Sequence, residues 1–337
     1  MLLTITIPTY KRPELLYKNL VHIFEQAASH DDVGVLVLDD SDGTVNEPWI
    51  ARIRKEFPQA RLDYVVNERN LGIDENIKNC ILSSTSEYVW LLGEDDLLTP
   101  NALATVKAAL VQKRPVFLFA NYIYCDDTHT HSAEAPVLGA GQGATVVRFN
   151  EFAAENIWAL GFIGGCVIRA ADWKRQDVSK FKGSYYSHVG GIVDAALDQD
   201  IVVVRDVMVL NRAEDVNTFT WSKSTFDVYF SFYDVLRKSR LSGKPELLAR
   251  CEHAAGHLFK IYSLAWLAAK RADGVYDADA YRNYYAGAPT GAGWHMAARA
   301  IAVFPRGPLR ILRRMHLRGR FSQTVSATIG RAEARTA

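Results

Sequence analysis

The stretch YVWLLGEDDLLTP, residues 88–100, runs from aromatic and apolar residues into three consecutive carboxylates and then returns to leucines. A short apolar run bounded by polar residues is typical of a buried strand. Glu94, Asp95 and Asp96 therefore stand at the end of an expected strand, where their mutual repulsion requires a positive partner. A divalent cation, Mg²⁺ or Mn²⁺, fits this role, because such ions are often held by one or two carboxylates plus substrate phosphates. An acidic turn before a helix is the alternative, since negative charge also suits a helix N-terminus.

Strand-like and helix-like runs alternate on both sides of this stretch. Strands are expected at 2–7, 33–40, 62–66, 87–92 and 116–123, and helices at 13–27, 48–57, 72–84 and 100–113. This alternation predicts an α/β fold with a mostly parallel sheet flanked by helices. Pro13 and the pair Thr99–Pro100 are expected to begin two of the helices. After residue 220 the apolar periodicity becomes helical.

Four polar clusters follow the expected strands directly. In sheets of this kind, ligands bind beyond the carboxyl ends of the strands. The triple carboxylate should therefore share one ligand-binding edge with the other clusters, which lie at 9–12, 39–42 and 67–70.

Four segments in this order carry a family resemblance: ITIPTYKRPELL (5–16), VGVLVLDDSDGT (33–44), NERNLGIDENIKNCI (67–81) and the carboxylate stretch. Together they resemble the nucleotide-sugar-binding half of family 2 glycosyltransferases of GT-A type, which have a Rossmann-like sheet. The sequences of these segments look most similar to the branch that builds bacterial surface polysaccharides, including abequosyltransferase-like members. The resemblance covers residues 1–125 and, more loosely, 160–215.

The resemblance implies a division of the chain into several parts. Residues 1–220 would form the GT-A catalytic domain, with the nucleotide-sugar-binding half at 1–125 and the acceptor half at 126–220. The helical periodicity after residue 220 and the arginine-rich end of the chain add a helical extension at 221–303 and a basic amphipathic tail at 304–337.

The resemblance also assigns nucleotide-binding and metal-binding residues. Asp40 would read the nucleobase, because a carboxylate can accept the imide hydrogen of uracil or thymine. Asp96 would be the principal ligand of the Mg²⁺ or Mn²⁺ ion, and Glu94 takes the first place of the D-x-D motif. The remaining nucleotide-binding assignments are Pro8, Thr9, Tyr10, Arg12, Asn70, Gly72 and Asp95.

The expected general base departs from the family pattern. GFIGGCVIRAADW (161–173) resembles the segment that precedes an acidic residue or pair at a helix start, but no such pair follows it. His188 and then Asp194 are the catalytic candidates instead, and the ordinary pKa of histidine, near 6.5, suits a base at neutral pH. Contact with metal or substrate, or a structural role, is the alternative for His188. Arg212 and Trp221 are expected to bind the diphosphate or the acceptor, unless their segment is a plain surface loop.

The charge distribution suggests a further partner. Nine arginines and no acidic residue lie between 280 and 332, and Glu333 and Arg335 cancel, so residues 1–279 carry a net charge of −8 within the overall +1. Arginines alternate with apolar residues at 304–321, which is typical of a helix lying on an anionic membrane surface. Intramolecular or oligomer packing is the alternative, and nucleic acid is not expected because no base-reading motif accompanies the arginines.

The sequence therefore predicts an inverting, metal-dependent glycosyltransferase. It would move a sugar from a nucleoside diphosphate donor to a bacterial surface glycan, carried on a polyprenyl lipid. No apolar run is long enough for a membrane span, so the expected location is cytoplasmic and peripheral on the inner face of the membrane. A nucleotidyltransferase and a non-catalytic nucleotide-sugar-binding protein are the alternatives, although PTYKRPELL lacks the glycines of a nucleotidyltransferase phosphate loop.

Overall fold

The computed structural model describes residues 1–126, 128–129, 132–133, 135–212, 225–259, 261–288 and 290–312. The strands are β1 (Leu3–Thr9), β2 (Val33–Asp39), β3 (Leu62–Val66), β4 (Tyr88–Leu91), β5 (Leu97–Leu98), β6 (Phe117–Cys125), β7 (Ala144–Arg148), β8 (Cys166–Arg169) and β9 (Asp200–Arg212). The α-helices are α1 (Pro13–Ala27), α2 (Glu47–Glu56), α3 (Ile73–Ser83), α4 (Ala102–Lys113), α5 (Phe149–Asn156), α6 (Ala170–Lys174), α7 (Ser187–Ala196), α8 (Thr225–Lys238), α9 (Pro245–Phe259), α10 (Leu264–Asp273), α11 (Ala278–Ala280) and α12 (Ala292–Val303). Shorter helical turns are η1 (Ile157–Gly161), η2 (Ile163–Gly165), η3 (Ser179–Phe181), η4 (Arg240–Gly243) and the π-helical η5 (Tyr281–Tyr285).

The nine strands form one sheet in the order β3-β2-β1-β4-β8-β6-β9-β5, and β7 pairs with β9. β1 pairs in parallel with both β2 and β4, and β2 pairs in parallel with β3. Beyond β4 the sheet is mixed, since β8 is antiparallel to β4 and β6, whereas β6 and β9 are parallel. The α/β prediction is confirmed, and its parallel part is concentrated in the first four strands.

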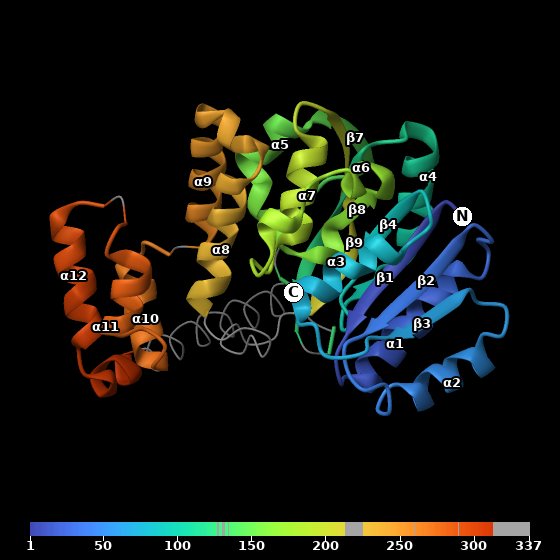
Figure 1. The fold of residues 1–337 in the computed structure, drawn as a ribbon, viewed down its shortest axis with the longest axis horizontal. Helices are drawn as coiled ribbons and strands as arrows, with labels where there is room; N and C mark the ends of the chain where they lie inside the picture. The colour runs from blue at the N-terminus through green and yellow to red at the C-terminus, as the bar shows by residue number, and fades with distance from the viewer. Residues whose placement is uncertain are drawn as a thin grey trace, which may run out of the picture. The chain divides into compact units, whose positions relative to one another are not determined.

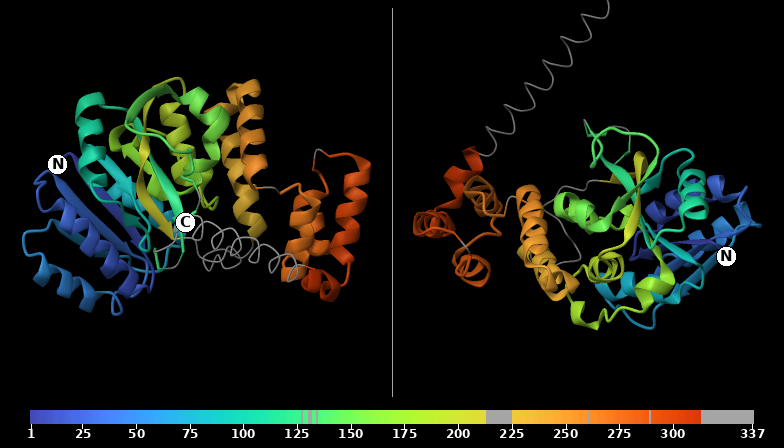
Figure 2. Two further views of the ribbon diagram at one scale, coloured as in Figure 1. Left: turned by 180° about the vertical axis from the view of Figure 1, so that it is seen from behind. Right: turned by 90° about the horizontal axis from the view of Figure 1, so that it is seen from above.

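β1 and β2 are interior strands of the sheet and are fully buried. Every residue of both strands is buried, as expected for strands covered on two faces. α1 packs against α2 and α4, whereas α3 packs against α6 and α7. Figure 1 and the view from above in Figure 2 show helices on both faces of this sheet. α1 turns one apolar stripe toward the sheet with Leu16, Leu20, Ile23 and Phe24.

The two expected helix starts had different outcomes. Pro13 is the first residue of α1, as predicted. The prediction for Thr99–Pro100 is wrong, because α4 begins at Ala102 after Asn101, whose φ of 66° is left-handed. The hydroxyl of Thr99 instead donates to the backbone oxygen of Val207 at 2.6 Å. This bond ties the segment after the carboxylates to β9.

The chain divides into two compact units. Unit 1 contains Met1–Trp221 and Ser231–Leu258, and unit 2 contains Ser222–Phe230 and Phe259–Ala337. Unit 1 thus includes residues 231–258, which the sequence analysis assigned to the separate helical extension. Their packing explains this, since the ring of Phe232 meets that of Tyr186 edge-on at 5.0 Å between centroids.

Unit 2 has its own aromatic core. Its most buried large side chains include Phe226, Tyr276 and Tyr285, and Tyr276 donates from its hydroxyl to the backbone oxygen of Ala298 on α12 at 3.1 Å. In the part of the chain that the structure describes, no helix has the length and apolarity that crossing a membrane requires.

Candidate functional site

The three carboxylates lie where the strand order changes direction. β2 and β3 follow β1 on one side of it, whereas β4 lies on the other side. The loop after β1 and the loop after β4 therefore leave the sheet as neighbours, which is the position where α/β sheets bind ligands. The side chain of Asn19 on α1 supports the second loop by donating to the backbone oxygen of Gly93 at 2.6 Å.

Glu94 is bound to the loop after β1. It accepts hydrogen bonds from the hydroxyl of Thr9 and from the backbone N–H of Tyr10, the latter at 3.0 Å. Its other oxygen lies 3.5 Å from Nε of Arg12. Burial raises the pKa of Glu94 to about 7. These contacts favour an anchor for the loop over the predicted role of metal ligand.

The other predicted residues at the end of β1 and in the loop after it lie in two environments. Pro8 is buried near the end of β1, like the rest of that strand. Tyr10 is 45% exposed, so solvent reaches its ring. Thr9 is buried, and its hydroxyl donates a hydrogen bond to Glu94. The loop therefore presents Tyr10 and Arg12 outward from a fixed base.

Asp95 lies between two arginines from distant parts of the chain. Nη1 of Arg12 is 3.0 Å from Oδ2 of Asp95, and Nη1 of Arg212, at the end of β9, is 3.5 Å from the same oxygen. The structure thus brings together three residues that the sequence analysis assigned to nucleotide and diphosphate binding. Guanidinium groups held at one point are suited to phosphate oxygens.

Asp96 is the most enclosed of the three carboxylates, with 4% exposure. Burial and then the charge of Asp95 raise its pKa. The backbone N–H of Arg212 donates to its Oδ1 at 3.1 Å. A Cβ on Gly93 would lie 2.3 Å from its Oδ2, so glycine at 93 leaves room for the Asp96 side chain.

The donor atoms present fit a hard divalent cation. Asp95 and Asp96 supply adjacent carboxylate oxygens, which are the ligands that Mg²⁺ prefers. Among the described residues there is no group of three or more His, Cys, Asp or Glu side chains arranged to hold a metal ion. Ions of this kind are usually held by one or two carboxylates together with substrate phosphates.

Asp40, Asn70 and Gly72 are brought together at the next strand end. Oδ1 of Asp40 accepts from the side chain of Asn67 at 3.0 Å and from the backbone N–H of Leu71 at 2.7 Å, and Oδ2 accepts from Gly72 N–H at 2.8 Å. Asn70 also accepts from Gly72 N–H. The φ of Gly72 is 82°, a left-handed value that favours glycine. Asp40 thus anchors the turn before α3, and its base-reading role stays a prediction.

The catalytic candidates His188 and Asp194 are both enclosed in unit 1. His188 on α7 is 1% exposed, its Nε2 lies 3.2 Å from the backbone oxygen of Leu160, and burial lowers its pKa to about 4. Asp194 forms an ion pair with Lys180 at 2.6 Å and accepts from the backbone N–H of Arg240 at 2.6 Å. Neither side chain contacts the carboxylate cluster in these bonds, so their placement favours structural roles over the predicted catalytic ones.

Several functional contacts were not foreseen from the sequence. Asn19 interrupts the apolar stripe of α1, and that interruption is the signal that could have identified it. Asp74 accepts from Gly183 N–H and from both the N–H and the hydroxyl of Ser187, so α3 holds the start of α7. His129 lies 3.0 Å from the backbone oxygen of Asp95 through its Nε2. The predicted Trp221 lies outside the described residues.

Comparisons with known proteins agree on the type of fold. Residues 4–174 match the family described as Glycosyl transferase family 2. The structure of residues 1–349 of TarS from S. aureus superposes with a TM-score of 0.58 at 16% identity, covering 82% of this chain and 81% of that one. Its complex with UDP-GlcNAc gives a TM-score of 0.57 at 16% identity, with 82% of each chain covered. At this identity the likeness shows the GT-A fold alone.

Two relatives match in sequence over the first part of the chain. Abequosyltransferase RfbV of Salmonella typhimurium is 31% identical over 120 residues, which are 35% of this chain and 35% of the relative. The uncharacterized glycosyltransferase MJ1057 of Methanocaldococcus jannaschii is 25% identical over 128 residues, which are 37% and 43% of the two chains. The matches thus span less than half the length of either relative.

Proposed function

Because the chain belongs to glycosyl transferase family 2, we propose that it is an inverting, metal-dependent glycosyltransferase. It takes a sugar from a nucleoside diphosphate donor and transfers it to a bacterial surface glycan carried on a polyprenyl lipid. The observation that carries this proposal is the meeting of Arg12, Asp95 and Arg212 beside the buried Asp96, at the sheet edge where ligands bind. The similarity to abequosyltransferase RfbV supports the choice of a surface glycan.

The cluster provides what a departing diphosphate needs. Arg12 and Arg212 donate to phosphate oxygens of the bound donor, in place of part of their contact with Asp95. Asp95 and Asp96 would hold Mg²⁺ or Mn²⁺, which stabilises the negative charge on the leaving phosphate. Glu94 keeps Thr9 and Tyr10 in place, so that the loop is already ordered when the donor arrives. Such preorganisation lowers the cost of binding.

The basic tail supports a membrane-bound acceptor and a location at the inner face of the membrane. A polyprenyl-linked acceptor lies in the membrane, and residues 304–337 carry the arginines that would hold the enzyme at its anionic cytoplasmic face. Most of this predicted tail, residues 313–337, lies outside the described residues.

Calorimetric titration with UDP, GDP, CDP and dTDP, each with and without Mn²⁺, tests donor recognition. One nucleotide should bind best, and Mn²⁺ should strengthen its binding. The corresponding nucleotide-sugar should then be hydrolysed slowly when no acceptor is present. If no nucleoside diphosphate binds in the presence of metal, the proposal is wrong.

A second candidate is a protein that binds a nucleotide-sugar without transferring the sugar. The enclosed positions of His188 and Asp194 favour it, because both predicted bases are already engaged inside unit 1. The two candidates differ in the hydrolysis experiment, since a binding protein retains the intact donor. Turnover of the donor by the purified chain, lost in Asp96→Ala, excludes the binding protein.

A further inference from the structure

Helix α12 of unit 2 presents apolar side chains to solvent. Met296 is 74% exposed and Val303 is 68% exposed, and Ala300 is also exposed between them. Their spacing of four and three residues places the three on one face of the helix. The opposite face packs into the aromatic core through Ala298 and Ala302. A surface helix normally carries charged residues on its outer face. The apolar strip of α12 departs from this pattern.

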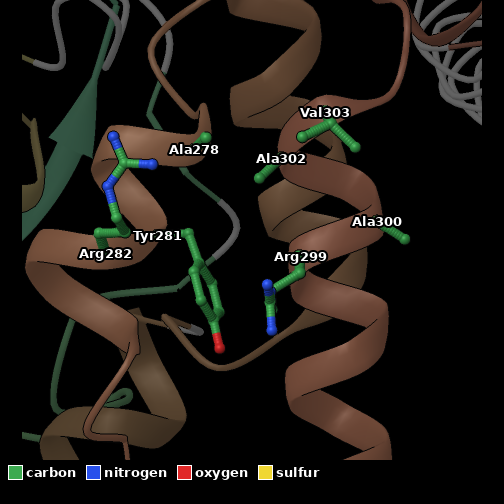
Figure 3. A pocket seen from close by; sticks show the side chains of 7 residues that line it. All are labelled: Ala278, Tyr281, Arg282, Arg299, Ala300, Ala302 and Val303. Carbon is green, nitrogen blue, oxygen red and sulfur yellow. The ribbon is translucent and has the colours of Figure 1, made fainter.

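A groove lies beside this strip, between α12 and the segment that contains α11 and η5. Its volume is about 450 Å³, and Val303 belongs both to the groove and to the strip. Figure 3 shows the ring of Tyr281 between the side chains of Arg282 and Arg299, and Ala300 of the strip also lines the groove. The guanidinium of Arg299 is 6.0 Å from the centroid of the Tyr281 ring. Two arginines facing one groove are suited to a phosphate group.

The charge along α12 and the segment after it is positive. Residues 280–312 contain four arginines and no aspartate, glutamate or lysine. Arg282 forms an ion pair with the exposed Asp279, but an exposed pair of this kind is weak and can exchange partners. Positive charge interleaved with exposed apolar side chains is the composition of surfaces that lie on anionic membranes.

The segment after α12 extends this composition. Residues 306–312 are helical, and Arg306 and Arg310 donate to the backbone oxygens of Gly274 and Ala272 at 3.0 and 2.9 Å. These bonds fix the segment to the end of α10. Ile311 and Leu312 nevertheless remain 62% exposed.

We propose that unit 2 docks on an anionic phospholipid bilayer through the α12 surface, which we define as Met296, Arg299, Ala300, Val303 and Phe304 with Arg282. The apolar side chains enter the interface, and the groove between Arg282 and Arg299 receives a lipid phosphate. This inference deepens the proposed membrane association, on which it rests, by assigning it to a folded surface rather than to the tail alone. A protein partner would need to be strongly acidic to match the same charge.

Sedimentation of the full chain with phosphatidylglycerol vesicles tests the docking. The pair Met296→Ser and Val303→Ser should weaken binding about tenfold, because two exposed apolar side chains no longer enter the interface. Arg299→Gln should weaken it about fivefold, the usual effect of one arginine near an anionic surface. Val111→Ser and Arg52→Gln are matched controls, since both residues are exposed on helices of unit 1. Phosphatidylcholine vesicles should bind the chain weakly.

A fluorescent label provides a second measurement that does not depend on weakened binding. The four cysteines of the chain are buried, so Met296→Cys can be labelled selectively with an environment-sensitive dye. The dye should shift to shorter wavelength with phosphatidylglycerol vesicles, and the same dye on Val111→Cys should not. Absence of a shift at 296 while the chain sediments overturns the proposal.

The outcomes separate this inference from those on which it rests. If deletion of 313–337 abolishes sedimentation and the α12 variants sediment normally, the tail alone binds the membrane and the α12 proposal is wrong. If sedimentation fails for every form while an acidic protein shifts the dye, the surface binds a protein instead. Nucleoside diphosphate binding by the α12 variants should equal that of the wild type, which tests the glycosyltransferase proposal independently.

Discussion

Glu94 accepts a hydrogen bond from the hydroxyl of Thr9, a residue 85 positions earlier in the chain. This contact joins the loop after β4 to the last residue of β1, at the point where the strand order changes direction. The first carboxylate of the EDD motif therefore joins two loops of the protein, whereas Asp95 pairs with Arg12 and Arg212 and Asp96 accepts from the backbone N–H of Arg212. The three acids differ in role because they differ in neighbours.

Glu94→Ala should weaken nucleoside diphosphate binding about tenfold. The substitution leaves the Thr9 hydroxyl and the Tyr10 N–H without their acceptor, and an unsatisfied buried polar group costs about 1–3 kcal/mol. Glu94→Gln retains a side-chain oxygen and should have a smaller effect. Calorimetric titration measures both, with the exposed Glu47→Ala as the control. Mn²⁺ should strengthen nucleoside diphosphate binding by the same factor in the wild type and in Glu94→Ala. If Mn²⁺ no longer strengthens binding to Glu94→Ala, Glu94 is a metal ligand.

Asp96→Ala should abolish the part of diphosphate binding that depends on metal. Mn²⁺ strengthens binding in the wild type because carboxylates and phosphates share the ion. A chelator should therefore weaken binding to the wild type and leave Asp96→Ala unchanged. Asp63→Ala, at an exposed position of β3, is the matched control. Near-normal turnover with an unchanged response to Mn²⁺ in Asp96→Ala would remove Asp96 from the metal site.

Asp40→Asn can distinguish stabilisation of the turn before α3 from recognition of the nucleobase. An amide nitrogen cannot accept the hydrogen bonds from Leu71 N–H or Gly72 N–H, so the turn before α3 should lose about 1–3 kcal/mol of stability. Urea unfolding measures this loss, and Asp42→Asn on the exposed part of the loop is the control. If Asp40 also reads the nucleobase, Asp40→Asn should reduce the differences in affinity between UDP, GDP, CDP and dTDP. Lower stability with unchanged preference limits Asp40 to the turn.

Local patterns predicted the elements of the first half of the fold closely. The helix at 13–27 and the strand at 62–66 have the expected bounds, because Pro13 begins the helix and apolar spacing marks both elements. The meeting of Arg12, Asp95 and Arg212 was not predicted as a contact. It depends on the pairing of β6 with β9 and of β5 with β9, and strand pairing between distant segments leaves little local signal.

The assignment of each carboxylate required tertiary structure for the same reason. Burial of Glu94 against Thr9 and of His188 against Leu160 determines what each group can do, and neither partner is near in sequence. Asn19 is the polar residue on the otherwise apolar buried face of α1, and Asp74 is a polar residue buried on α3. Such interruptions indicate a buried hydrogen bond without naming its partner.

The burial of His188 predicts how stability should depend on pH. Its pKa in the folded chain is about 4, below the value near 6.5 of an unfolded histidine. Between these values the unfolded chain binds a proton that the folded chain does not, so stability falls as pH decreases from about 6.5 towards 4. The full effect is about 3 kcal/mol. A glutamine side chain does not titrate in this range, so urea unfolding of His188→Gln should show a smaller loss in acid.

The same experiment decides whether His188 can serve as a base. The exposed His253→Gln is the control, and it should reproduce the pH dependence of the wild type. If His188→Gln also reproduces it, the imidazole titrates in the folded chain as it does in water, and solvent reaches it. That result would return His188 to the catalytic candidates, because a group open to water is open to an acceptor hydroxyl. A reduced loss in His188→Gln instead confirms a closed, neutral imidazole and directs the search for the base to the side chains around Asp95.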